Sequence, residues 1–199
     1  MPRPEEVAYY IQGLWLLLKG KPEAFGYLDL SERGFWRSWW SLLYSLPPLL
    51  LVYAARRDMY LSDSVVGTHI GSDFFFKMAA LDLAATAFAT IALFIVARLG
   101  GFREHAPAII IVTNWLSVPL VWMSSIQNLI QLYVPGSDIA SGIAELIYFS
   151  LTVYICTRLI NRLVGGNSLI TAASVLTLFI VPIVCGYYLA DIIALVPGS

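Results

Sequence analysis

The chain has 199 residues, of which 59% are hydrophobic and 13% are charged, and its formal net charge at pH 7 is −1. A soluble domain is about 45–50% apolar and about 25% charged, so a single water-soluble core cannot bury this much apolar surface. The near-zero net charge excludes a general electrostatic attraction to nucleic acid. These properties predict an all-α integral membrane protein, whose first partner is the lipid bilayer.

Residues 4–19 are predicted to form an amphipathic helix. Its apolar stripe consists of Val7, Ile11, Leu14 and Leu18. The segment is too polar to cross a bilayer, so we predict that it lies in the interface between lipid and water, with Trp15 as an interface anchor. A helix docked on the membrane-spanning bundle is the alternative. Gly20, Pro22 and Gly26 then end the helix and begin a short connector.

Five segments are long enough to cross about 30 Å of hydrocarbon, which takes roughly 20 helical residues. They cover residues 35–55, 74–99, 106–133, 139–160 and 169–196. Trp36, Trp39 and Trp40 crowd the start of the first segment, where indole rings anchor a helix at headgroup level. We therefore predict two parts: an interfacial helix with its connector at 1–34, and a five-helix transmembrane domain at 35–199.

The positions of Lys and Arg predict the orientation of the chain. With a cytoplasmic N-terminus, nine of the twelve lie on the inner side, and only Arg56, Arg57 and Lys77 lie on the outer side. This distribution follows the positive-inside rule, although the pair Arg56–Arg57 opposes it. We therefore predict that the N-terminus is cytoplasmic and the C-terminus extracytoplasmic.

Three acidic residues lie within the apolar segments: Asp82, Glu145 and Asp191. Charged groups inside a bilayer are costly, so each is a candidate functional residue until a partner explains it. If successive helices alternate in direction, all three lie nearer the same face of the membrane, and further polar side chains lie at a similar depth. The further members of this candidate intramembrane site are Gln127, Asn128, Gln131 and Tyr188.

Two interpretations of this polar cluster remain open. In the first, the cluster forms an outward-facing chamber that binds a cation, a proton or a polar head group. In the second, its side chains form hydrogen bonds between helices and hold the bundle together.

We expect no catalytic residues, no metal site and no cofactor. The sequence has no GxSxG, HExxH, P-loop or GxGxxG motif. His69 and His105 fall on opposite sides of the predicted bundle, so they cannot share a site. The chain is therefore predicted not to be an enzyme.

Three short stretches carry a resemblance to a known family. Residues 29–36 read Asp-Leu-Ser-Glu-Arg-Gly-Phe-Trp, residues 115–119 read Trp-Leu-Ser-Val-Pro, and residues 21–25 read Lys-Pro-Glu-Ala-Phe. They resemble stretches of the Yip family (Ypt/Rab-interacting proteins and their bacterial relatives). Residues 29–36 are similar to the family's Asp-Leu-Tyr-Gly-Pro-Phe-Trp entry to the first span. Residues 115–119 are similar to its Tyr-Ser-Leu…Pro stretch in the third span, and residues 21–25 to its Pro-x-x-Ala-Phe connector. The first stretch has one extra residue and lacks the proline.

The resemblance implies a non-enzymatic membrane protein of a bacterial inner membrane that acts through helix and partner contacts. We therefore expect a Yip-like scaffold or membrane-organising protein that binds another membrane protein or itself. A small transporter or channel subunit that uses the acidic cluster is the first alternative. An accessory subunit of a larger membrane complex is the second.

Overall fold

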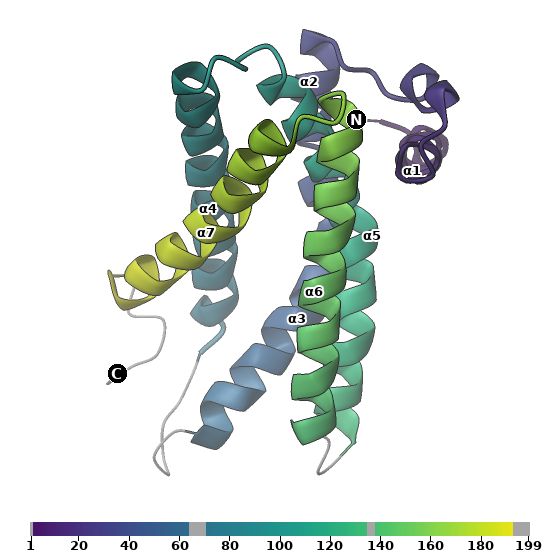
Figure 1. Cartoon of the computed structure of the whole chain (residues 1–199). Coiled ribbons are helices and arrows are strands. Elements are labelled where there is room, and N and C mark those ends of the chain that lie inside the picture. Colours follow the sequence, from purple (N-terminus) through teal and green to yellow (C-terminus); the bar gives the residue numbers. More distant parts are fainter. Residues whose placement is uncertain (1, 64–70, 135–137, 193–199) are drawn as a thin grey trace.

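The computed structural model describes residues 2–63, 71–134 and 138–192, and of residues 63, 138, 191 and 192 it describes the backbone only (Figure 1). Every regular element in these ranges is a helix. In chain order they are α1 (Pro4–Leu18), the 3-10 helix η1 (Pro22–Gly26), α2 (Glu32–Ser38), α3 (Ser41–Asp63), α4 (Asp73–Leu99), α5 (Ala106–Tyr133), α6 (Asp138–Leu163) and α7 (Ser168–Ile192).

Four helices, α4 to α7, are long and apolar enough to cross a membrane, with mean hydropathies between 1.7 and 2.3 over their most apolar stretches. They correspond to the last four predicted spans, and their bounds differ from the predicted ones by only a few residues. The end of the last predicted span, residues 193–196, lies outside the described residues. The prediction of an all-α membrane protein is therefore confirmed.

The first predicted span, residues 35–55, is not one continuous helix. α2 ends at Ser38, α3 begins at Ser41, and Trp39 and Trp40 form the turn between them. This turn leaves a short apolar stretch in α3 before the charged residues at 56–58. Because of these charges, α3 is not among the four helices that qualify by hydropathy.

Successive helices from α3 to α7 run in alternating directions, with connections at opposite ends of the bundle (Figure 1). α3 packs mainly along α5, α5 also packs on α6, and α7 packs mainly along α4. The largest core cluster joins α1, α5 and α6 around Trp115, whose side chain is fully buried. This choice of neighbours decides which polar side chains can meet.

α1 is docked on α5 and α6 by its apolar side. The ring of Tyr10 stacks on that of Trp115, with centroids 4.6 Å apart and planes inclined by 8°. Leu17 is also buried, whereas the predicted stripe residues Ile11 and Leu18 are only partly buried. The buried face is thus rotated slightly from the predicted one, because the large Tyr10 ring faces the bundle. Trp15 on the other side is 56% exposed.

Polar contacts hold α1 on α2 and Pro2 on α3, and others order the connector before α2. Arg37 forms an ion pair with Glu6, and the Tyr44 hydroxyl donates a hydrogen bond of 2.6 Å to the carbonyl oxygen of Pro2. The Asp29 carboxylate accepts hydrogen bonds from the Ser31 hydroxyl at 2.5 Å and the Ser31 amide at 3.1 Å. These hydrogen bonds lower the pKa of Asp29, because they favour its charged form.

Candidate functional site

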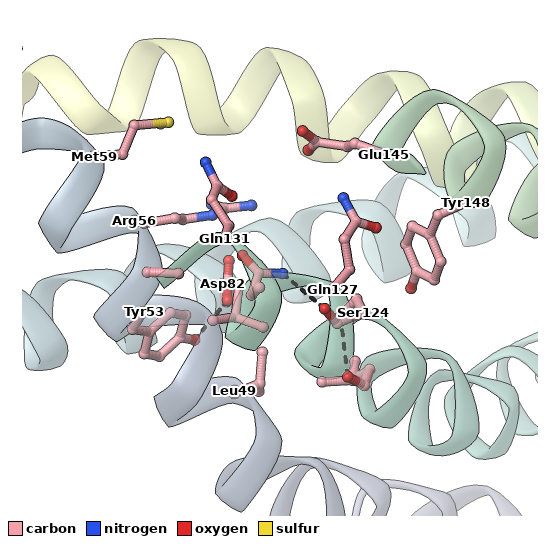
Figure 2. Close-up of a pocket in the computed structure, with 14 residues that line it drawn as sticks. Leu49, Tyr53, Arg56, Met59, Asp82, Ser124, Gln127, Gln131, Glu145 and Tyr148 are labelled. Atoms are coloured by element: carbon pink, nitrogen blue, oxygen red, sulfur yellow. Dashed lines mark hydrogen bonds between the residues drawn. The ribbon is translucent and has the colours of Figure 1, made fainter. Parts of the chain in front are cut away.

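A cavity of about 290 Å³ lies between α3, α4, α5 and α6 (Figure 2). Apolar side chains, among them Leu49 and Val121, form part of its wall. Its polar lining residues are Tyr53, Arg56, Asp82, Ser124, Gln127, Asn128, Gln131, Glu145 and Tyr148. Three of these carry formal charge, which is unusual for a space between apolar helices.

Five of the seven predicted site residues line this cavity. They are Asp82 from α4, Gln127, Asn128 and Gln131 from α5, and Glu145 from α6. Tyr188 does not line it: its side chain, on α7, is 64% exposed. α7 packs along α4 rather than along α3, and none of the described residues that line the cavity comes from α7. The side chain of Asp191 lies outside the described part of the chain.

Four polar lining residues were absent from the predicted site: Ser124 of α5, Tyr148 of α6, and Tyr53 and Arg56 of α3. Tyr53 and Arg56 lie three residues apart, which places them on one side of α3. The sequence contained one indication of this role: Arg56 belongs to the basic pair that opposes the positive-inside rule. A basic residue on the side poor in Lys and Arg needs another explanation, and the cavity supplies one for Arg56.

Asp82 is held by a partner on α3. The hydroxyl of Tyr53, which is 2% exposed, donates a hydrogen bond of 2.5 Å to Asp82 Oδ2 (Figure 2). Arg56 is near enough for its guanidinium to attract the Asp82 carboxylate. The Tyr53 hydroxyl thus supplies a hydrogen-bond donor to the Asp82 carboxylate, and this pairing also fixes α3 to α4.

Glu145 has a different environment. Its side chain is exposed and faces the cavity from α6 (Figure 2). Within the described ranges its carboxylate takes part in no hydrogen bond or ion pair. Glu145 therefore contributes a negative charge to the cavity that the surrounding side chains do not neutralise.

The amide and tyrosine side chains of the cavity wall join α5 to α6. Gln127 Nε2 donates a hydrogen bond of 3.0 Å to the carbonyl oxygen of Ser141, and the Tyr148 hydroxyl donates one of 3.1 Å to that of Leu120. Hydrogen bonds of this kind hold helices together where lipid offers no hydrophobic force between them. Each of the two interpretations therefore describes part of the polar cluster. Gln127 and Tyr148 form hydrogen bonds between helices, and the charged residues line a chamber.

The four predicted interface anchors differ in exposure. Trp15, Trp36 and Trp40 are between 40% and 66% exposed. Trp39 is only partly exposed, and its Nε1 atom is buried without a hydrogen-bond partner among the described residues. Its ring lies edge-on to that of Phe35, with centroids 6.4 Å apart. Trp39 therefore packs against the protein, while the other three can contact lipid headgroups.

Among the described residues, no group of three His, Cys, Asp or Glu side chains is placed to hold a metal ion. His69 lies outside these residues. Comparison with protein-family models, curated proteins and solved structures gives no match. The fold and the cavity define the class of the protein as a helical integral membrane protein with a charged cavity between its helices.

Proposed function

We propose that the chain is a small transporter or channel subunit that binds a cationic solute in the cavity between α3, α4, α5 and α6. The observation that supports this function is that three charged residues, Arg56, Asp82 and Glu145, line the same cavity. Charged side chains among apolar helices are costly and are typical of solute and ion pathways. Because Asp82 is already paired with Tyr53, the carboxylate of Glu145 is the group that attracts a positive charge.

A thermal-unfolding series in mild detergent tests this function. Between pH 5 and 8 we expect Na⁺, K⁺, Mg²⁺ or ethylammonium chloride to raise the unfolding temperature of the wild type. A ligand at a hundred times its Kd stabilises a protein by about 2.7 kcal/mol. Glu145→Gln should fold normally and lose this protection, because the amide carries no charge. Asp82→Asn should weaken it, because the positive charge of Arg56 in the same cavity then has no acid but Glu145 among the described lining residues to balance it.

The matched control is Glu23→Gln, which removes an exposed acid of η1 far from the cavity. It should keep the full protection by the cation. Identical curves for all variants, with no dependence on any of the four cations, would contradict the proposed binding function.

The same proposal assigns α3 as a fifth span. Its direction alternates with that of α4, and it packs along α5, which supports this assignment. We further propose that the N-terminus is cytoplasmic, in a bacterial inner membrane, and that the cavity opens to the extracytoplasmic side. The exposed rings of Tyr9 and Trp15 support a position of α1 at the lipid–water interface while it is docked on the bundle.

Cysteine labelling tests the span count and the orientation. In a background with Cys156 and Cys185 replaced by alanine, an impermeant thiol reagent added outside should label Ser137→Cys and leave Gly26→Cys and Gly101→Cys unlabelled. Labelling of Gly26→Cys together with Ser137→Cys would show that α3 does not cross the membrane. The fully reversed pattern would overturn the orientation.

The second candidate function is a Yip-like scaffold that binds another membrane protein. It is favoured by a cavity of about 470 Å³ beside α1, whose wall combines aromatic rings with carboxylates. The charged and aromatic members are Glu5, Glu6, Tyr9, Tyr10, Tyr27, Asp29 and Arg37. The excess of carboxylates is complementary to a basic segment of a partner. If added cations do not stabilise the protein in the thermal-unfolding series, we would retain only this scaffold function.

A further inference from the structure

The last turn of α6 faces a cavity at the end of the bundle where α1 lies. The cavity has a volume of about 350 Å³, and its lining residues are Arg158, Asn161, Arg162, Gly165 and Gly166. Gly165 and Gly166 have φ values of 67° and 86°, and a Cβ atom on either would meet nothing within 4 Å. The turn between α6 and α7 therefore leaves open space beside the two arginines.

The turn that follows α1 brings further positive charge to this place. Gly20 has a φ of 75°, and a Cβ atom on it would lie 2.8 Å from Cζ of Arg162. The Arg162 guanidinium thus lies against Gly20, whose neighbours in the sequence are Lys19 and Lys21. Four cationic residues from two distant parts of the sequence are gathered at one end of the bundle.

None of these four residues forms an ion pair with an acid of the described residues. The ion pairs there are Arg37–Glu6 and Lys77–Asp73, and neither includes a member of this cluster. All four side chains are exposed. The negative end of the α6 dipole, about half an elementary charge, offsets only a small part of four positive charges. The net field at this cavity therefore attracts an anion.

Two aromatic contacts indicate that this cluster lies at the level of the lipid headgroups. The Lys19 ammonium lies 4.7 Å above the Trp15 ring, and the Arg158 guanidinium lies 6.0 Å from the Tyr154 ring. Both rings are more than half exposed. Trp and Tyr rings are enriched where hydrocarbon meets headgroups, and a long cationic side chain beside such a ring reaches toward the phosphates.

We propose that Arg158 and Arg162, with Lys19 and Lys21, bind the phosphate group of an anionic phospholipid. A guanidinium presents its N–H groups in a fork that matches two phosphate oxygens, and two such forks face one cavity. The ligand is a phosphate diester whose acyl chains lie along the apolar side of α6. This site is independent of the cavity near Glu145, which lies in the other half of the bundle.

The test is a titration of the purified full chain in neutral detergent with short-chain phosphatidylglycerol, read by native mass spectrometry as the fraction of lipid-bound protein. We expect the wild type to bind phosphatidylglycerol more tightly than phosphatidylcholine. Each removed charge near a membrane surface weakens the binding of anionic lipid about fivefold, so Arg158→Gln should raise the Kd about fivefold. The double variant Arg158→Gln/Arg162→Gln should raise it about 25-fold.

Arg103→Gln is the matched control, because it removes a positive charge in the exposed turn after α4 and outside this cavity; it should leave the Kd unchanged. Loss of Arg162 removes its contact with Gly20 and can loosen α1, so Arg158→Gln, which leaves Arg162 in place, keeps the test decisive. Equal binding of the two lipids, or an unchanged Kd in both variants, would overturn the proposal. If soluble glycerol phosphate competes at the same concentration as the lipid, the site binds a free phosphate ester, and the proposal that its ligand is a lipid is wrong.

Discussion

Replacement of Trp115 by alanine is expected to destabilise the protein by about 3–5 kcal/mol, the range for a buried Trp or Phe cut to Ala. Trp115 is fully buried at the centre of the cluster that joins α1, α5 and α6. Its ring stacks on Tyr10 at 4.6 Å, so the variant loses both a filled core and a stacking contact with α1. We expect α1 to detach before the bundle unfolds.

The measurement is thermal unfolding in detergent, together with limited proteolysis between α1 and α2. Trp122→Ala is the matched control, since Trp122 lies on the same helix and is 50% exposed. It should change the free energy of unfolding by less than about 1 kcal/mol, because a lipid-facing indole leaves no cavity. Equal losses for the two variants would contradict the role of Trp115 in docking α1.

Gly34→Ala is expected to have the second largest effect. A Cβ atom at Gly34 would lie 1.8 Å from the carbonyl oxygen of Asp29 and 2.7 Å from its carbonyl carbon. The backbone at Asp29 cannot move aside easily, because its carboxylate holds Ser31, and the Ser31 hydroxyl accepts the Gly34 amide at 3.3 Å as the N-cap of α2. Overpacking of a well-packed site costs about 1–3 kcal/mol, and a clash as close as this one with the backbone should reach the upper value.

The consequence of that change extends to α1. α2 carries Arg37, which pairs with Glu6, so a displaced α2 should also release the N-terminal helix. Gly26→Ala is the control within the same connector, since a Cβ there would meet nothing within 4 Å. Proteolysis should therefore cut the Gly34 variant near α1 much faster than the Gly26 variant or the wild type. Equal cleavage rates would show that the connector adapts to the added methyl group.

The sequence by itself determined the four apolar helices α4 to α7 and the common depth of most of the site. Lipid accepts only apolar side chains, so the length and hydropathy of a segment predict a span whatever its neighbours are. Depth follows from residue number, because each residue advances a helix by about 1.5 Å. Asp82, Gln127 and Glu145 could therefore be assigned to one level of the bundle before any contact was known.

Only the tertiary structure decided which side chains at that level meet. Tyr188 was expected in the cluster, but α7 packs along α4 and leaves its ring exposed. Tyr53 and Arg56 joined the cavity because α3 packs along α5, and α1 turned its Tyr10 ring inward because Trp115 offers a stacking partner. The rotation of a helix about its axis and its choice of neighbour depend on side chains distant in the sequence, which hydropathy and helical rise do not encode.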